Sequence, residues 1–266
     1  MSPAVAKIAR TTVAAALAGV GTVAASKLAQ RKPSVQARLL RTNFRGEEVT
    51  LAEGPAIVAG LCATALVDPP AAVAALSAGS LGLVDDLTGT TDRRGFAGHL
   101  GALTHGELTT GAVKIIGIGV TGLLVAGVID RRRLRPDTLL AAGLIAGGAN
   151  LINLFDLRPG RALKVSALLA TPLLLAGAPA APVVLGAAAG AACDDLAGRS
   201  MMGDTGANAL GAVLGVAAAR RLGPRGRATG FAAVLALTLA SEAVSFSKVI
   251  ESSPVLRAID HWGRPR

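Results

Sequence analysis

The chain has 266 residues, of which 52% are hydrophobic and only 17% are charged, and its mean hydropathy is +0.54. This composition argues against a soluble domain, because several runs stay apolar for about 15 to 20 residues, close to the length of a membrane-crossing helix. The net charge of +10 does not predict nucleic-acid binding, since the basic residues lie in short loops and few aromatic side chains are present for base stacking.

Nine apolar segments follow one another along the chain. They predict an all-α fold, a polytopic transmembrane helical bundle of about nine spans that forms a single membrane domain over residues 1–266. The runs do not alternate, which argues against a transmembrane β-barrel. The predicted spans cover residues 11–29, 51–67, 70–84, 111–129, 138–155, 163–177, 180–193, 206–219 and 228–247.

Three details of this layout have alternative interpretations. The first thirty residues resemble a signal peptide, with Lys7 and Arg10 before an apolar run, but the polytopic chain that follows favours a first transmembrane helix. Residues 163–177 and 180–193 are short and separated only by GAPAAP, so they form two tilted helices, a re-entrant pair or one broken helix. Neither of the two cysteines indicates a disulfide or a zinc site.

Charge predicts the orientation. Placing residues 27–45 inside puts most basic residues on the cytoplasmic face, as expected for a multi-pass protein of the cell membrane. The basic stretches at residues 131–135 and 220–227 then fall outside, against the rule.

Three acidic stretches end or begin predicted spans on the cytoplasmic face. They are GLVDD, NLINLFD and MMGD, and an even number of crossings separates each from the next, so we expect them to converge on one cytosolic cavity. A single aspartate here is often only a solvated helix end, and Asp204 also fits an N-cap. Three such groups on one face favour a functional site, because charges at the ends of apolar helices are costly unless they are hydrated, paired or bound to a cation.

Clustered carboxylates predict a hard cation, Mg²⁺ with Mn²⁺ as an alternative, which binds together with substrate phosphates. Asn150 and Asn153 lie on one predicted helical face that Asp156 continues, and this polar stripe suits a sugar, a base or a phosphate-bound metal. Lys114 begins an apolar helix, where it either reaches the membrane interface or contacts a phosphate beside the metal.

The motifs GLVDDLTG, NLINLFDLRPG and MMGDTGANALG, in this order and separated by paired spans, resemble the polyprenyl-phosphate N-acetylhexosamine-1-phosphate transferase family. That family includes phospho-N-acetylmuramoyl-pentapeptide transferase, and the resemblance covers about residues 40–262. It implies transfer of a sugar-1-phosphate from a UDP-linked amino sugar to polyprenyl phosphate, with release of UMP and a requirement for Mg²⁺. It places the active site on the cytoplasmic face, in cell-envelope glycan synthesis, and it leaves a homodimer open.

The resemblance also implies roles for individual residues. Gly54 stands at a family glycine in the first cytosolic loop. The catalytic set is Asp85, Asp86 and Lys114, the substrate-binding set is Asn150, Asn153, Asp156 and Asp194, and the metal-binding set is Asp204 and Asp156.

The chain departs from the family pattern in three places. One lies about ten residues before Asp204, where the family often has Asn and this chain has Asp194 or Asp195. Where the family continues NLTDGLDGLA, this chain reads NLFDLRPGRALK, so an acidic position is lost and Arg158, Arg161 and Lys164 are present instead. The segment that resembles the family's His-rich loop holds one histidine, His261, beside the only tryptophan, Trp262.

These departures support an alternative function, a non-catalytic relative that acts as a scaffold or lipid-phosphate binder in envelope assembly. A transporter is disfavoured, because we find no inverted repeat and the acidic groups lie at one face and not at the midplane. The motif of CDP-alcohol phosphotransferases is not found in the sequence.

Overall fold

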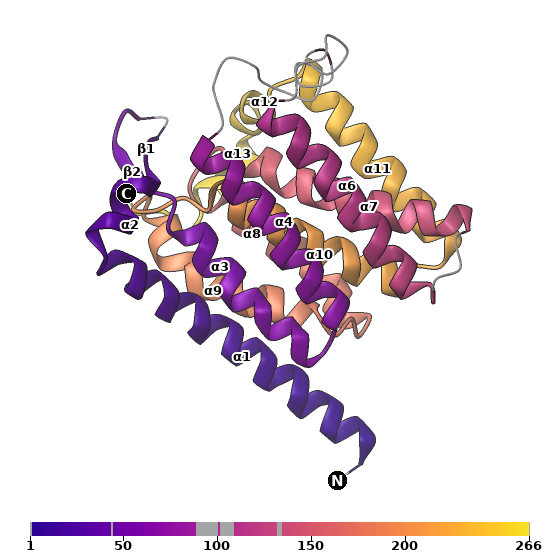
Figure 1. Cartoon of the computed structure of the whole chain (residues 1–266). Coiled ribbons are helices and arrows are strands. Elements are labelled where there is room, and N and C mark those ends of the chain that lie inside the picture. Colours follow the sequence, from indigo (N-terminus) through magenta and orange to yellow (C-terminus); the bar gives the residue numbers. More distant parts are fainter. Residues whose placement is uncertain (1, 44, 89–100, 102–108, 132–134, 266) are drawn as a thin grey trace.

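The computed structural model describes residues 2–43, 45–88, 101, 109–131 and 135–265, and these form mainly helices (Figure 1), which confirms the all-α prediction. The described elements are α1 (Pro3–Gln30), α2 (Pro33–Leu39), β1 (Leu40–Thr42), β2 (Glu48–Thr50), α3 (Glu53–Leu61), the 3₁₀-helix η1 (Cys62–Leu66), α4 (Pro69–Thr88), α6 (Thr110–Ile129), α7 (Pro136–Phe155), α8 (Arg161–Leu175), α9 (Ala181–Leu196), α10 (Gly203–Arg221), α11 (Pro224–Ala243), α12 (Phe246–Ser252) and α13 (Pro254–His261).

Helix α10 is the centre of the bundle. It packs against α3, α4, α6, α7, α8 and α9, and it is buried along nearly its whole length from Thr205 to Ala219. Protein and not lipid therefore surrounds this helix, which explains how it tolerates Asn208 in its middle.

Small residues permit a very close contact between α7 and α10. A Cβ on Gly211 would lie 2.1 Å from the backbone oxygen of Gly148, and a Cβ on Gly215 would lie 2.4 Å from that of Leu144. The two backbones touch along this line, as is common where transmembrane helices pack through glycine and alanine.

The helices fall at the nine predicted segments, but nine membrane spans are not confirmed. By length and composition, four described helices can cross a membrane, namely α1, α4, α6 and α7. A fifth span would arise if α11 and α12, which meet at an angle of 90°, count as one bent span. Helix α8 has only 15 residues, a length of about 22 Å, which is less than the roughly 30 Å of a bilayer core.

The outer faces of the bundle expose large apolar side chains, as expected of a surface in contact with lipid. Val20 on α1 and Leu124 on α6 are each 67% exposed, and Leu175 at the end of α8 is 82% exposed. These faces and the long apolar helices are compatible with a membrane protein.

The GAPAAP segment forms a helical hairpin. Gly177 adopts a left-handed backbone conformation after the end of α8, and α8 and α9 then pack against each other. At their far ends, Leu196 of α9 would contact a Cβ placed on Gly160, which precedes α8. The two helices are thus antiparallel, which rules out a single broken helix and returns the chain to the side of Asp156.

Some of the basic residues that violate the charge rule have structural partners at the opposite end of the bundle. Arg227 is buried and pairs with Asp130 at 2.9 Å and with Asp137 at 2.8 Å, and it also donates to the backbone oxygen of Ala219. Arg220 pairs with the buried Asp68 at 2.7 Å. These arginines join helix ends to one another, so they carry little information on orientation. Residues 132–134 of the other basic stretch lie outside the described residues.

A short β-hairpin, which the sequence analysis did not predict, precedes α3. Leu40 pairs with Thr50 and Thr42 with Glu48, and the side chain of Asn43 accepts hydrogen bonds within the turn. The backbone of Thr50 accepts a hydrogen bond from Met201 at 3.0 Å. The hairpin thus fixes the segment that leads into α10.

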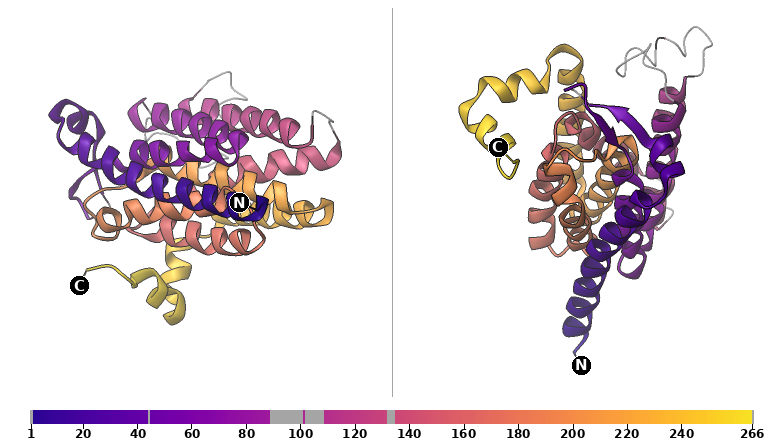
Figure 2. Two further views of the ribbon diagram at one scale, coloured as in Figure 1. Left: turned by 90° about the horizontal axis from the view of Figure 1, so that it is seen from below. Right: turned by 90° about the vertical axis from the view of Figure 1, so that its left-hand side faces the viewer.

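Helices α12 and α13 project from the side of the bundle (Figure 2). Their attachment is polar and well buried: the guanidinium of Arg161, at the start of α8, donates to both carboxylate oxygens of Asp260 at 2.8 and 3.1 Å and to Ser247 at 2.9 Å. Phe246 stacks on Phe155, with ring centroids 5.3 Å apart.

Candidate functional site

Helix ends bring an ammonium group and two carboxylates together at one end of the bundle. Asp85 lies in the last turn of α4, Lys114 in the second turn of α6, and Asp204 in the first turn of α10. The Lys114 ammonium lies 2.5 Å from Asp85 Oδ2 and also forms an ion pair with Asp204 Oδ2. The predicted convergence of these residues is therefore present, and Lys114 faces the carboxylates and not the lipid interface.

Asp86 points in another direction and caps α10 from a neighbouring helix. Its Oδ1 accepts a hydrogen bond from the backbone N–H of Asp204 at 3.1 Å. Its Oδ2 accepts from the Thr205 N–H at 2.9 Å and from the Thr205 hydroxyl at 2.6 Å. The prediction that Asp204 is the N-cap is wrong, because α10 begins at Gly203 and Met202 stands at the cap position.

The cap requires α4 and the start of α10 to lie very close together. A Cβ on Gly82 would lie 2.4 Å from the backbone oxygen of Asp204. Gly203 has a φ of +57°, and a Cβ there would lie 2.9 Å from Asp86 Oδ2. Glycine at both positions lets the carboxylate of one helix reach the N–H groups of the other.

Asp156 joins the cluster from the end of α7, where it is the C-cap residue. Burial raises the pKa of Asp156 well above its ordinary value, and the charges of Asp195, Asp204 and Asp86 raise it further. A hydrogen bond from the backbone of Gly203 opposes this shift. Asp156 therefore lies where several carboxylates repel one another, and a bound cation would relieve that repulsion.

Asp195, and not Asp194, faces the interior. Asp195 is 2% exposed, and its Oδ2 has no hydrogen-bond partner within the described residues. Asp194 instead pairs with Arg199 at 2.6 Å near the surface and accepts a hydrogen bond from Gln30 at 3.3 Å. The sequence places both aspartates at the end of α9, and only the packing of that helix separates them.

Glu53 is a buried acidic residue that the sequence analysis missed. It is 2% exposed at the start of α3, and one of its oxygens accepts a hydrogen bond from the Ser200 hydroxyl. The signal was its place beside Gly54, in an EGP stretch that opens an apolar segment. A Cβ on Gly54 would lie 2.2 Å from the backbone oxygen of Met202, so Glu53 lies beside the segment that leads into α10.

The residues of the predicted polar stripe on α7 lie in two different environments. The amide of Asn150 donates to the hydroxyl of Thr238 on α11 at 3.0 Å, away from the carboxylates. Asn153 is half-buried in the last turn of the helix, close in sequence to Asp156. Asn150 thus connects two helices, and Asp156 is the member of the stripe that reaches the cluster.

The residues that depart from the family pattern hold the C-terminal segment. Arg161 binds Asp260 and Ser247, and Lys164 donates to the backbone oxygen of Asp260 at 2.6 Å. Burial alone would raise the pKa of Asp260, but hydrogen bonds from Arg161 and the surrounding positive charges hold it below its ordinary value. Arg158 lies 4.0 Å from Glu251. The three basic residues of this stretch therefore anchor the C-terminal segment.

The donor set suits Mg²⁺ without forming a complete cage. Within the residues that the structure describes, no three His, Cys, Asp or Glu side chains surround a common point at metal-ligand spacing. Asp156 and Asp204 nevertheless offer hard oxygen ligands, and the buried Asp195, whose Oδ2 has no hydrogen-bond partner among the described residues, lies near Asp156. One or two carboxylates are enough, because Mg²⁺ usually completes its coordination with water and substrate phosphates.

No protein-family model matches this chain, and no curated protein is similar enough to count as a match.

Proposed function

We propose that this protein is a membrane transferase that moves a sugar-1-phosphate, with an N-acetylhexosamine as the sugar, from a UDP-sugar to polyprenyl phosphate and releases UMP. The observation that carries the proposal is the position of Lys114 between Asp85 and Asp204, with Asp156 close by, at one end of an apolar helical bundle. Metal-binding carboxylates beside a lysine are a recurrent arrangement for binding phosphate groups.

The reaction is a phosphoryl transfer in which one P–O bond forms and one P–O bond breaks. An oxygen of the lipid phosphate attacks the phosphorus that carries the sugar, a new P–O bond forms, and the bond to the bridging oxygen breaks as UMP leaves. The lipid phosphate is already anionic at neutral pH, so no general base is required. Positioning and charge neutralisation dominate this chemistry.

Each residue of the cluster has a role in this proposal. The Lys114 ammonium suits a phosphate oxygen, and Asp85 keeps the lysine charged and oriented. Asp156 and Asp204 would hold Mg²⁺, which supplies positive charge against the diphosphate when it is bound. Asp86 holds α10, and thus Asp204, in place.

The direct test is an assay of purified protein with Mg²⁺, undecaprenyl phosphate and a panel of UDP-sugars. We expect a lipid-linked product and an equal amount of UMP from at least one donor. Asp204→Asn removes the negative charge of the proposed ligand with little change in volume and should abolish both products. Asp194→Asn is the matched control, because Asp194 belongs to a partly exposed ion pair, and it should retain activity. Absence of product with every donor, or an active Asp204→Asn variant, would refute the proposal.

Topology provides an independent test. The proposal needs residues 85, 156 and 204 on the cytoplasmic face, and single cysteines placed there in a background without Cys62 and Cys193 can be labelled from either side. Labelling of any one of the three from the outer face contradicts the proposal.

A second candidate is a non-catalytic relative that binds a lipid phosphate. The specific observation in its favour is that Lys114 is already paired with Asp85 and Asp204, while Arg161 and Lys164 hold a C-terminal segment where the family has an acidic motif. Binding of polyprenyl phosphate without release of UMP from any donor would favour this candidate.

A further inference from the structure

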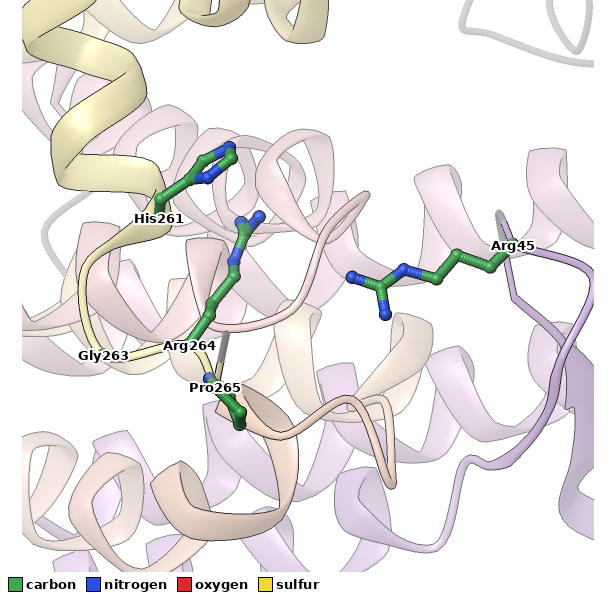
Figure 3. A pocket seen from close by; sticks show the side chains of 5 residues that line it. All are labelled: Arg45, His261, Gly263, Arg264 and Pro265. Carbon is green, nitrogen blue, oxygen red and sulfur yellow. The ribbon is translucent and has the colours of Figure 1, made fainter.

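A separate polar pocket lies between the β-hairpin and the C-terminal segment. It has a volume of about 440 Å³ and is lined by Arg45, His261, Gly263, Arg264 and Pro265. Figure 3 shows the Arg45 side chain extending from the hairpin side toward the space beside Arg264 and His261. Two guanidinium groups and an imidazole thus line one space, although they come from opposite ends of the sequence.

We infer that this pocket binds the phosphate group of a small ligand. Arginine side chains are well suited to this task, because the planar guanidinium offers several N–H donors that match phosphate oxygens. A volume of about 440 Å³ lies within the range of small-molecule sites and exceeds what a bare phosphate needs, so the ligand is a phosphate attached to a further small group.

Contacts with neighbouring groups hold Arg264 in place, so one wall of the pocket is preformed. Its Nε donates to the backbone oxygen of Pro159 at 2.8 Å, and its Nη2 lies 2.9 Å from Asp260 Oδ1. The side chain of Arg264 is only 13% exposed. Asp260 is in turn held by Arg161, so the position of Arg264 depends on a chain of ion pairs that reaches into α8. An anchored arginine loses less side-chain freedom when it binds an anion.

Positive charge dominates the surroundings of the pocket. Arg161 shares the carboxylate of Asp260 with Arg264, and Lys164 donates to the backbone oxygen of Asp260. Two carboxylates, Asp260 and Asp195, therefore face three cationic side chains, those of Arg161, Lys164 and Arg264. The excess of positive charge favours an anion in the open space.

A tryptophan beside the pocket can report ligand binding by its fluorescence. Trp262 is the only tryptophan of the chain, it directly follows His261, and it is 76% exposed. The experiment uses full-length protein in nanodiscs of neutral lipid and follows the Trp262 fluorescence during titration with inorganic pyrophosphate. We expect a saturable change. Loss of one charge-assisted contact in Arg45→Gln should weaken the affinity about tenfold.

The variants separate binding from folding. Arg264→Gln should also weaken binding, but it can loosen the C-terminal segment, whereas Arg45→Gln lies on another element and leaves that anchor intact. Arg257→Gln, on the exposed face of α13, is the matched control and should bind like the wild type. Absence of saturable binding in the wild type, or equal affinity of Arg45→Gln and the control, overturns the inference.

A second arm identifies the source of the phosphate. Nanodiscs that contain phosphatidic acid offer the same phosphate chemistry on a lipid headgroup. An Arg45-dependent change of Trp262 fluorescence in these discs without pyrophosphate indicates a lipid ligand, and a change only with pyrophosphate indicates a soluble one. The inference does not depend on transferase activity: Asp204→Asn should still bind pyrophosphate even though it should form no product.

Discussion

Replacing Asp86 should show how strongly the start of α10 depends on a carboxylate from α4. Asp86→Ala removes three accepted hydrogen bonds, two from backbone N–H groups and one from the Thr205 hydroxyl. Loss of a helix cap typically costs about 0.5–2 kcal/mol, and hydrogen bonds to a charged group lie at the upper end of the usual range. Because the Asp86 side chain is only half-buried, water can replace part of what is lost.

We therefore expect Asp86→Ala to lower the free energy of unfolding by about 2 kcal/mol, and Thr205→Val, which removes one of the three bonds, by about 1 kcal/mol. For a chain of this size, a loss of about 2 kcal/mol lowers the Tm by about 4–8 °C. Thermal unfolding of detergent-solubilised protein measures both.

The control is Asp194→Ala, which removes a partly exposed ion pair and should cost less than about 1 kcal/mol. If Asp86→Ala unfolds at the same temperature as this control, the reasoning about the cap is wrong. If both are strongly destabilised, the loss does not come from the cap.

Three further predictions follow from the remaining ion pairs and buried carboxylates. Lys114→Met should abolish transfer, whereas Lys114→Arg should retain a part of it, because only the second keeps a positive charge between the two carboxylates; product formation measures this. Asp195→Asn should alter transfer or its Mg²⁺ dependence at least tenfold more than Asp194→Asn, because only Asp195 is buried beside the cluster, and equal effects would contradict the assignment. The folded-state pKa of Asp260 is lowered, so its anchoring contribution is fully present above the ordinary Asp pKa of about 3.9 and is lost as the pH falls through the lowered value. Trp262 fluorescence should report the acid-induced release of the C-terminal segment in the wild type. In Asp260→Asn the C-terminal segment should be released already at neutral pH.

The fold was predictable where the sequence pattern is local. Apolar runs and Pro- or Gly-rich breaks predict the order of the helices, because a span needs a continuous apolar stretch. The number of spans did not follow from this pattern. Helices that are buried by neighbours, such as α10, and helices of 15 or 16 residues, such as α8 and α9, resemble spans in sequence without meeting the criteria of length and hydropathy.

The sequence predicts which acidic residues meet at the site, but it does not predict the directions of their side chains. Counting helix crossings predicts correctly that Asp85, Asp156 and Asp204 meet at one end, because that depends only on topology. Which of two adjacent aspartates faces inward depends on the rotation of the helix and on its last turn. For this reason the sequence could not separate Asp194 from Asp195, nor show that Asp86 turns away from its neighbour to cap α10.

The trans-helical cap has a consequence for how a phosphate can be accommodated. The N-terminus of a helix is a common binding place for phosphate, since its free N–H groups and the helix dipole favour an anion. In α10 the N–H groups of Asp204 and Thr205 are already bound to Asp86, which carries the negative charge that a phosphate would bring. A phosphate that enters this cluster must therefore find its positive partner in Lys114 or in a metal ion, and not in the backbone of α10.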